Sequence, residues 1–464
     1  MNRKPRAAVW PFYLKLYDDI QPATRAGFDA FLADIRRGLE GRGLAVSLAP
    51  VCRVASEFEA AAAQLEAAGA DCLVTVHLAY SPSLEAIDAC CRTSLPLLLL
   101  DTTMDAAFGP GTDPGRIMFN HGVHGVMDLA SLLRRRRRPF EIVAGPLANP
   151  RTLDRAAALV RTAAMARDFR STRAARIGPA FAGMGDFAAP ESVLADRLGI
   201  RVTQLEAAAV GAAAAAVTPA QAAAELEADR ARFDCEAEAV VHERSIRVGL
   251  GLRHVLDEGG FTAFSANFQA FGAEAGPAAA MPFLEIAKAM GRGLGYAGEG
   301  DVLTAALVGA LARGFGAATF TEIFCPDWAG NSLFLSHMGE ISPSVAGARP
   351  RIITKRPFPF GPQPPAVLVC PVRAGPAVFV NLAPGPDDHF TLIVAPVDVL
   401  PDDGAGPLRD TVRAWIRPRG AVSGFLEAYS RLGGTHHSAL VLGEAAEAVS
   451  AFGRFAGLDP VVLE

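Results

Sequence analysis

Apolar runs alternate with amphipathic stretches over the first 136 residues of the chain. The apolar runs are short enough for buried strands, and they are Ala7–Tyr13, Leu44–Val51, Asp71–His77 and Leu95–Asp101. The stretches between them have apolar positions at helical spacing, and they are Thr24–Arg42, Glu57–Ala68, Ser83–Thr93 and Gly122–Arg136. Strands that alternate with helices predict a parallel sheet with right-handed crossovers. We therefore expect a Rossmann-like α/β domain over residues 1–149.

A second α/β domain is expected over residues 150–317, where the alternation continues less regularly. A strand is predicted at Ala175–Ile177, and helices are predicted at Glu191–Leu198, Pro219–Arg232, Leu284–Arg292 and Val302–Arg313. The loop Pro179–Phe187 is rich in glycine but lacks the GxGxxG spacing of a dinucleotide site, which favours a tight turn before a helix. The alanine-rich run Ala207–Ala216 is consistent with a tightly packed helix or a flexible loop.

Short strands separated by turns dominate after residue 317. Strands are predicted at Val367–Cys370, Ala377–Leu382, Phe390–Val397 and Ala439–Val441, with one helix at Gly424–Arg431. This succession predicts a small antiparallel barrel or sandwich over residues 318–464. The expected fold class is therefore α/β, with a parallel-sheet domain, a second α/β domain and a C-terminal barrel-like domain.

A β-hairpin is predicted where this third region begins. The β-rich runs Ala318–Phe324 and Ser332–Ile341 flank a centre rich in turn residues. If the turn is centred between residues 329 and 330, Glu322 lies opposite His337, with Cβ atoms roughly 4.5–5.5 Å apart. A carboxylate and an imidazole at that distance can share a divalent ion. Either residue alone is more often a solvated glutamate or a hydrogen-bonded core histidine, and Glu340 returns to the same face only at a bulge or strand end.

Two further segments carry candidate ligands. The glycine-rich segment GLGYAGEGD ends with Glu299 and Asp301 at a predicted helix start, where acidic residues are also common caps. The segment GGTHHS contains His436 and His437, which point in different directions in extended backbone, so at most one is expected to be a ligand. Glu299, Glu322, His337 and one of His436 and His437 form a set of two carboxylates and two imidazoles that suits Mn²⁺ and also accepts Co²⁺, Fe²⁺, Ni²⁺ or Zn²⁺.

Composition excludes several classes of protein. The chain has 44 basic and 49 acidic residues, so a nucleic-acid binder with a strongly basic face is not expected. Its seven cysteines form no CxxC pair, which indicates reduced thiols. No apolar run reaches the roughly 18 residues of a membrane span, and no secretory signal is recognised. We expect a soluble cytoplasmic protein.

Four motifs, in this order along the chain, resemble the L-arabinose isomerase and L-fucose isomerase superfamily, and its arabinose isomerase branch in particular. They are GYAGEGDVLTAAL, TFTEIF, LSHMGEISPS and GGTHHS, and they begin at residues 295, 319, 335 and 433. The resemblance implies a metal site formed by Glu299, Glu322, His337 and His437. It also implies substrate contacts from Asp301, Phe320, Glu340 and His436. The segment FNHGVHG is similar to one whose histidine, here His124, reaches a neighbouring subunit, which implies a homo-oligomer, a trimer or hexamer, with shared active sites.

The resemblance implies a metal-dependent aldose–ketose isomerase. Its expected substrate is an unphosphorylated pentose or deoxyhexose of the L-arabinose or L-fucose type, converted through a metal-stabilised enediol with Glu299 and Glu322 as base and acid. Which glutamate takes the proton stays open, and a hydride shift is the mechanistic alternative. Other classes that fit the ligand set are a metal-dependent hydrolase or lyase and a sugar-binding protein derived from an isomerase. The chain departs from the family pattern at Trp10–Tyr17 and Pro179–Phe187, which leaves the sugar open.

Overall fold

The computed structural model describes residues 3–356, 359 and 361–464. The chain divides into two compact units. The first extends to Arg167 and includes Arg454–Gly457, and the second holds Asp168–Gly453 and Leu458–Glu464. The structure confirms the predicted α/β class, because it contains two parallel sheets and a closed antiparallel barrel.

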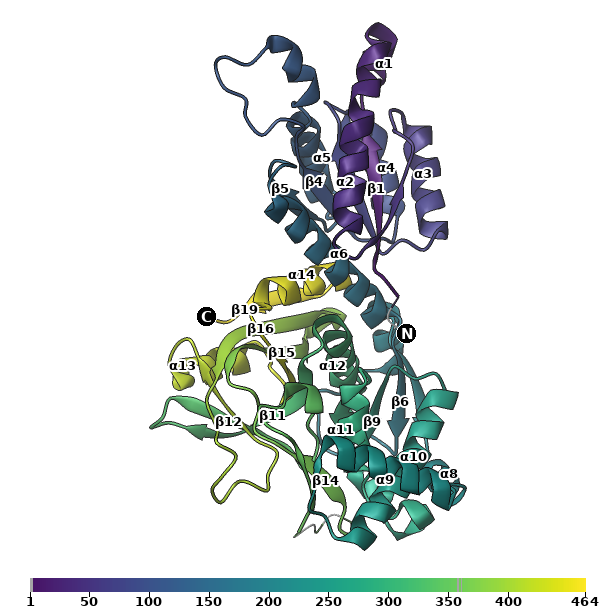
Figure 1. Ribbon diagram of the computed structural model, residues 1–464, viewed down its shortest axis with the longest axis vertical. Coiled ribbons are helices and arrows are strands. Elements are labelled where there is room, and N and C mark those ends of the chain that lie inside the picture. The colour runs from purple at the N-terminus through teal and green to yellow at the C-terminus, as the bar shows by residue number, and fades with distance from the viewer. Residues whose placement is uncertain (1–2, 357–358, 360) are drawn as a thin grey trace. The chain divides into compact units, whose positions relative to one another are not determined.

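The first unit is built on a five-stranded parallel sheet (Figure 1) with strand order β2-β1-β3-β4-β5. Its strands are β1 (Arg6–Phe12), β2 (Ala45–Leu48), β3 (Cys72–His77), β4 (Leu97–Asp101) and β5 (Glu141–Ala144). Its helices are α1 (Lys15–Ile20), α2 (Asp29–Glu40), α3 (Ala55–Ala67), α4 (Ser83–Arg92), α5 (Val123–Arg135) and α6 (Pro150–Arg170), which continues past Arg167. Alternate residues of β1 point to opposite faces, so Val9 packs in one core with α2 and α6, and Trp10 packs in the other with α3, α4 and α5.

The largest differences from the sequence prediction in this unit concern two long helical segments. The predicted helix Thr24–Arg42 is divided into a 3-10 segment, Pro22–Phe28, and the helix α2. The division lies beside Gly27, where a Cβ would lie 2.7 Å from the ring of Phe119. The long helix α6 was not predicted at all.

The second unit begins with a four-stranded parallel sheet in the order β10-β9-β6-β7. Its strands are β6 (Arg173–Ile177), β7 (Arg201–Leu205), β9 (Ala263–Ala266) and β10 (Gly295–Gly298). Its helices are α7 (Glu191–Leu198), α8 (Ala207–Ala215), α9 (Pro219–Arg232), α10 (Ala239–Glu258), α11 (Phe283–Gly291) and α12 (Val302–Phe315). The alanine-rich run is the helix α8 rather than a loop. The helix α9 has the predicted bounds, because Thr218 and Gln221 form a capping box and Pro219 occupies the first turn.

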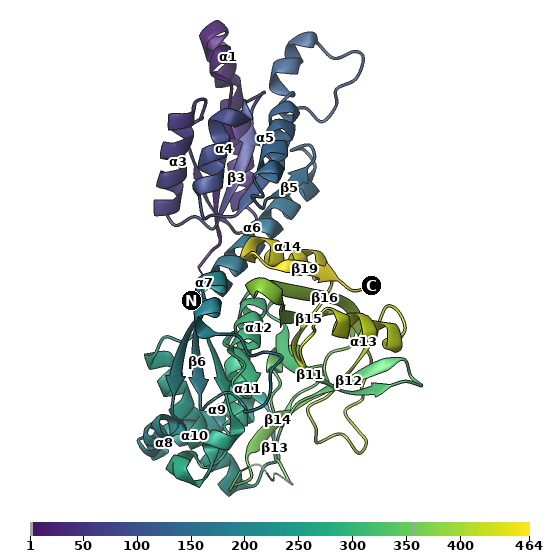
Figure 2. The same cartoon turned by 180° about the vertical axis from the view of Figure 1, so that it is seen from behind.

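Six antiparallel strands of the second unit close into a barrel, because β15 pairs with both β18 and β16 (Figure 2). The barrel strands are β11 (Ala318–Asp327), β12 (Ser332–Ser336), β15 (Gly375–Pro384), β16 (Phe390–Val399), β17 (Ala414–Pro418) and β18 (His437–Leu442). The other strands and α-helices are β8 (Asp234–Cys235), β13 (Arg351–Thr354), β14 (Ala366–Val369), α13 (Val422–Arg431), α14 (Ala446–Ala456) and β19 (Asp459–Val462). Of the two predicted alternatives, barrel and sandwich, the structure has the barrel.

The helix α12 joins the central sheet to the barrel, since it packs against β9, β10, β11 and β18. The three-domain division predicted from the sequence, with boundaries at residues 150 and 318, stays a prediction. Within the described residues, no single helix is both long and apolar enough to cross a membrane. The pair α8 and α9 meets the length and composition requirement only together, with a bend of 103° between them.

Glycine is required where α12 crosses β10. A Cβ at Gly295 would lie 1.9 Å from the carbonyl oxygen of Ala305 and 2.9 Å from the Cα of Gly309. Backbone atoms cannot rotate away as side-chain ends can, so any larger residue forces the helix and the strand apart. The ends of both elements carry candidate site residues, Glu299 and Asp301, so this close approach helps to position the site.

We predict that Gly295→Ala destabilises the protein by roughly 1–3 kcal/mol, the usual cost of overpacking a well-packed core. The matched control is Gly424→Ala in the exposed face of α13, where a new Cβ meets no atom of the described chain within 4 Å. That control should stabilise by up to about 1 kcal/mol, because alanine is the better helix former. Urea unfolding followed by circular dichroism measures both changes, and a Gly295→Ala protein as stable as wild type would contradict the prediction.

Candidate active site

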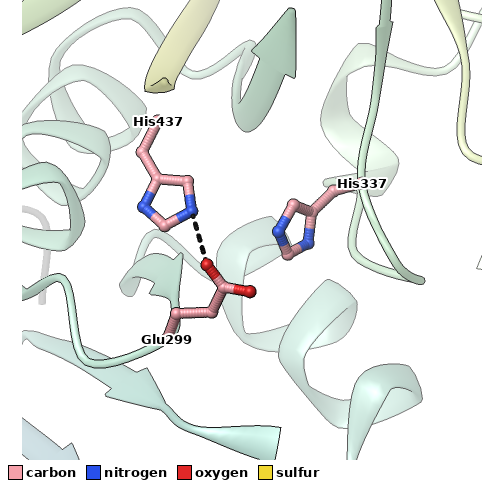
Figure 3. Close-up of side chains that lie close together, drawn as sticks. All are labelled: Glu299, His337 and His437. Carbon is pink, nitrogen blue, oxygen red and sulfur yellow. Dashed lines mark ion pairs between the residues drawn. The ribbon is translucent and has the colours of Figure 1, made fainter. Parts of the chain in front are cut away.

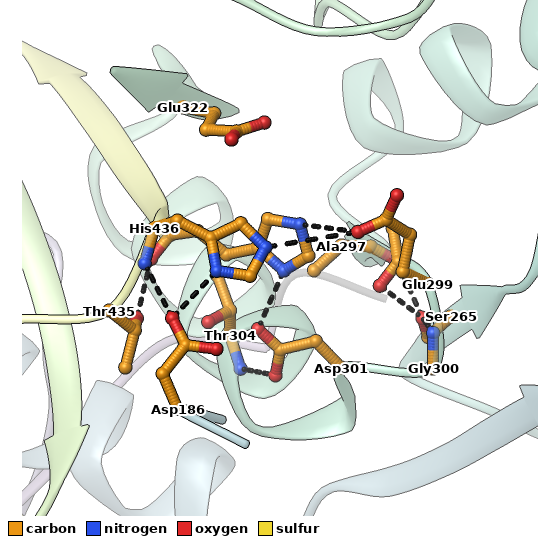
Figure 4. Close-up of polar contacts among 12 residues, drawn as sticks. Asp186, Ser265, Ala297, Glu299, Gly300, Asp301, Thr304, Glu322, Thr435 and His436 are labelled. Atoms are coloured by element: carbon orange, nitrogen blue, oxygen red, sulfur yellow. Dashed lines mark hydrogen bonds and ion pairs between the residues drawn. The ribbon is translucent and has the colours of Figure 1, made fainter. Parts of the chain in front are cut away.

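Glu299 follows β10 in a left-handed backbone conformation, with φ of 64°. A non-glycine residue in this region costs about 1–3 kcal/mol, so its surroundings must hold it there. The hydroxyl of Ser265 accepts a hydrogen bond from the Gly300 N–H at 2.8 Å, and the Glu299 N–H donates to the carbonyl of Ala266 at 3.2 Å. The Phe181 N–H donates to the Glu299 carbonyl at 2.8 Å. These bonds fix the direction in which the Glu299 carboxylate leaves the backbone (Figure 4).

Asp301 is both a helix cap and a partner of His437. Its Oδ1 accepts the Thr304 N–H at 2.8 Å, which caps α12. Its Oδ2 lies 3.1 Å from Nδ1 of His437, and both side chains are fully buried. The capping interpretation therefore holds, while the same carboxylate also orients an imidazole. Whether Asp301 contacts a substrate stays a prediction.

The predicted pairing of Glu322 with His337 is wrong in register. Glu322 lies opposite Ser336 of β12, because a bulge between Ile323 and Cys325 leaves Phe324 without a partner on that strand. On its other side, however, β11 pairs with β18, and there Glu322 lies directly opposite His437. Opposed residues share one face of a sheet, so the carboxylate and this imidazole point the same way.

His337 follows the last residue of β12 and still reaches the site. Its Nε2 lies 3.8 Å from Oε2 of Glu322, and its Nδ1 lies 2.7 Å from Oε2 of Glu340. Glu340 lies on the same side as His337 because β12 has already ended. A strand end was one of the two conditions that the sequence analysis gave for this. The buried Glu340 carboxylate also accepts hydrogen bonds from the Tyr296 hydroxyl and the Gly339 N–H, both at 2.8 Å. Its role in the structure is thus to hold His337, and its predicted substrate contact stays untested.

Three of the four predicted ligands converge (Figure 3): one ligand atom each from Glu299, His337 and His437 lies within 4.8 Å of the other two. Glu322 is not in this group. Both imidazoles have a carboxylate at Nδ1, which leaves Nε2 free for an ion. In His437 this Nε2 is buried without a hydrogen bond to any described residue, 3.4 Å from Oε2 of Glu299. Such a donor set, two imidazoles and a carboxylate without thiolates, fits a first-row divalent ion.

The two glutamates differ in their electrostatic surroundings. Burial alone would raise the pKa of Glu299, but the imidazoles of His436 and His437 outweigh it and lower the pKa to about 2. Burial raises the pKa of Glu322, and the nearby histidines do not compensate. Burial would also lower the pKa of His437, but Asp301 and Glu299 raise it to about 9. Without a metal ion, Glu299 and His437 therefore form an ion pair, whereas Glu322 is the more easily protonated carboxylate.

The structure adds two residues that the sequence did not indicate, Asp186 and Phe187. The Asp186 carboxylate binds the backbone N–H and the ring of His436. The buried Phe187 ring stacks on His437, with centroids 5.3 Å apart. Both belong to the loop interpreted as a tight turn, and no ligand-like spacing marks them.

Two other predicted substrate residues have defined places. The Phe320 ring is buried between His337 and His437, with centroids 4.8 and 5.1 Å away. His124 lies on α5 of the first unit, where its ring is 5.9 Å from that of His121. Contacts of Phe320, His436 and His124 with a substrate stay predictions.

Comparison with known proteins identifies the family. Residues 194–314 match the L-arabinose isomerase central domain, and residues 317–459 match the L-arabinose isomerase C-terminal domain, which together exceed half of the chain. The L-arabinose isomerase of Acidothermus cellulolyticus is 28% identical over 399 residues, 83% of this chain and 79% of that protein. The chain belongs to the L-arabinose isomerase family.

Other relatives agree with this assignment. The L-arabinose isomerase of Anoxybacillus flavithermus is 27% identical over 84% of this chain and 80% of its own length. That of Geobacillus kaustophilus is 32% identical over 47% of this chain and 44% of its own length. The resemblance noted in the sequence and the expected enzyme class, an aldose–ketose isomerase, are confirmed. The L-fucose isomerase part of that resemblance gains no support.

The raised pKa of His437 predicts a pH-dependent contribution to stability in protein freed of divalent ions. The folded state holds the proton up to about pH 9, whereas the unfolded chain releases it near the ordinary value of 6.5. Wild type should therefore exceed His437→Gln in stability most below pH 6.5. The difference should shrink by up to about 1.4 kcal/mol per pH unit toward pH 9. Urea unfolding of both proteins in EDTA between pH 6 and 9 measures it, and a constant difference would count against the ion pair.

Proposed function

We propose that this protein interconverts L-arabinose and L-ribulose with the aid of a divalent ion. The observation that carries the proposal is the convergence of Glu299, His337 and His437, in which each imidazole is held at Nδ1 by a buried carboxylate. The choice of sugar follows the names of the relatives, which are L-arabinose isomerases over most of the chain. Mn²⁺ is the proposed ion, with Co²⁺, Fe²⁺, Ni²⁺ and Zn²⁺ as alternatives.

The donor set supports an ion at this position. Asp301 and Glu340 fix the two imidazoles so that both Nε2 atoms are available, and Glu299 is held ionised. An ion bound there would polarise the C1 and C2 oxygens of the sugar as a Lewis acid. Glu322, whose carboxylate lies 3.8 Å from the Nε2 of His337, is the remaining predicted ligand.

We assign the transfer of the C2 proton to Glu322. A general base works best when its pKa is near the working pH, and burial raises the pKa of Glu322 while that of Glu299 is lowered to about 2. Glu322 takes the proton from C2 of the aldose and returns it to C1, so the C2–H bond breaks and a C1–H bond forms through an enediol. The hydroxyl proton passes from O2 to O1 in the same cycle. His436 is the proposed carrier, because Glu299 and Asp186 raise its pKa against the opposing effect of burial.

Sugar conversion by the metal-loaded protein tests the function. After metal analysis, the wild-type protein is incubated with Mn²⁺ and L-arabinose, D-galactose, L-fucose, D-arabinose or L-ribulose. We expect conversion of L-arabinose and L-ribulose into each other, loss of the activity in EDTA and its return with Mn²⁺. Glu322→Gln should lower kcat by about 10²- to 10⁴-fold. It should still bind Mn²⁺, since the three converging ligands remain.

The matched control for Glu322→Gln is Glu444→Gln, which changes an exposed carboxylate just beyond β18 and should leave kcat and KM unchanged. No conversion of any sugar with metal bound would overturn the proposed function. Hydrolysis of a sugar derivative by the same protein would instead support the hydrolase alternative.

The fate of the C2 proton tests the enediol route. In D₂O the proton held by Glu322 can exchange with solvent before it reaches C1, because the carboxylate is only partly buried. We therefore expect deuterium at C1 of L-ribulose formed from L-arabinose, measured by NMR of the product. A hydride shift carries the original hydrogen from C2 to C1, so a complete absence of deuterium would count against the enediol route.

A further inference from the structure

Every histidine at the candidate site has a carboxylate at its Nδ1. Glu340 holds His337 and Asp301 holds His437, and both carboxylates come from segments that carry ligands themselves. The third histidine, His436, is held by Asp186, which comes from the loop between β6 and α7 and lies 250 residues away in the sequence (Figure 4).

The contact of Asp186 with His436 is made through a single oxygen. Its Oδ2 accepts the His436 backbone N–H at 2.9 Å and lies 2.6 Å from the ring Nδ1. An ionised carboxylate can only accept hydrogen bonds, so Nδ1 carries a hydrogen and Nε2 is the atom turned the other way. The Nε2 atom lies 3.8 Å from Oε2 of Glu299, and it is buried without a hydrogen bond to any described residue.

The loop that carries Asp186 is anchored to the same site. At its start, the Asn267 side chain donates to the Pro179 carbonyl at 2.9 Å, and the Phe181 N–H donates to the Glu299 carbonyl at 2.8 Å. The loop passes so close to Gly300 that a Cβ there would lie 2.4 Å from the Cα of Ala180. At its end, the buried Phe187 ring stacks on His437. Asp186 therefore has a defined position relative to Glu299 and to His437.

We propose that Asp186 is the positioning residue for His436 and turns its Nε2 toward a hydroxyl of the bound sugar. The proposal rests on the proposed function, because it assigns the buried, unpaired Nε2 to the substrate. The orientation requires the Asp186 oxygen, since a ring free to rotate about its bonds loses the direction of Nε2. His437 keeps Asp301, so metal binding does not depend on Asp186.

The kinetic test compares Asp186→Ala and Asp186→Asn with wild type. We expect Asp186→Ala to raise KM for L-arabinose on the order of 10- to 100-fold, by analogy with the loss of a carboxylate behind a metal-ligating histidine. Because His436 is also the proposed carrier of the hydroxyl proton, kcat should fall as well, whereas the change in Mn²⁺ affinity should be smaller. Asp186→Asn keeps an oxygen acceptor and should recover part of the loss. The control Asp196→Ala changes an exposed carboxylate on α7 and should behave like wild type.

A double-mutant cycle separates positioning from a general structural role. If Asp186 acts through His436, Asp186→Ala adds nothing to the loss caused by His436→Ala. Additive losses, an unchanged KM in Asp186→Ala, or a fall in Mn²⁺ affinity equal to the rise in KM would each overturn the proposal.

A crystal structure of Asp186→Ala tests whether Asp186 positions His436 without a measurement of enzymatic activity. We expect the His436 ring to leave its present orientation, with Nε2 no longer beside Glu299, while His437 stays in place. A retained ring would overturn the proposal. If the wild-type protein converts no sugar, the proposed function is overturned. The orientation of the His436 ring in the Asp186→Ala crystal structure still shows whether Asp186 positions that ring.

Discussion

The geometry of the candidate site depends on hydrogen bonds between carboxylates and the Nδ1 atoms of its histidines. A buried carboxylate alone is costly, because it loses its hydration. Asp301 and Glu340 avoid that cost by accepting several hydrogen bonds each, from Thr304 and His437 in one case and from Tyr296, Gly339 and His337 in the other. The result is that Nε2 of each candidate ligand histidine, His337 and His437, faces the position proposed for the ion.

The fold brings the carboxylates of Glu299 and Asp301 to the barrel through one helix. The helix α12 follows β10 of the central sheet and packs against the barrel strands β11 and β18. Its start carries Glu299, in a left-handed conformation, and Asp301, the cap. Because Gly295 and Gly309 let helix and strand approach closely, the candidate ligands from the sheet and those from the barrel meet. The candidate site thus forms where α12 packs the parallel central sheet against the antiparallel barrel.

Glu299 and Glu322 have different surroundings, which suit different chemical roles. Glu299 is close to two imidazoles and stays ionised, which suits an ion ligand. Glu322 is partly buried, and this burial raises the pKa of its carboxylate, which suits proton transfer. The loop with Asp186 and Phe187 completes the wall around His436 and His437. The resemblance described in the sequence analysis also marks this loop as a departure from the family pattern.

Local signals in the sequence determined the type and order of most helices and strands. The helix α9 was predicted at its observed bounds, and Thr218, Pro219 and Gln221 form a start signal within four residues. Asp301 was recognisable as a cap for the same reason, and the turn between β11 and β12 is visible in its turn residues. The four ordered motifs were enough to indicate the family and the candidate ligands.

Only the tertiary structure decided which of these residues meet. The bulge at Phe324 moved Glu322 away from His337 in the hairpin register, and the pairing of β11 with β18 placed it opposite His437 instead. Asp301 and His437 are 136 residues apart, and Asp186 and His436 are 250 apart. Periodicity and capping report on backbone preferences within a few residues, whereas register and long-range contacts depend on how complete elements pack. The sequence by itself therefore determined the candidate ligands, and packing determined their partners and directions.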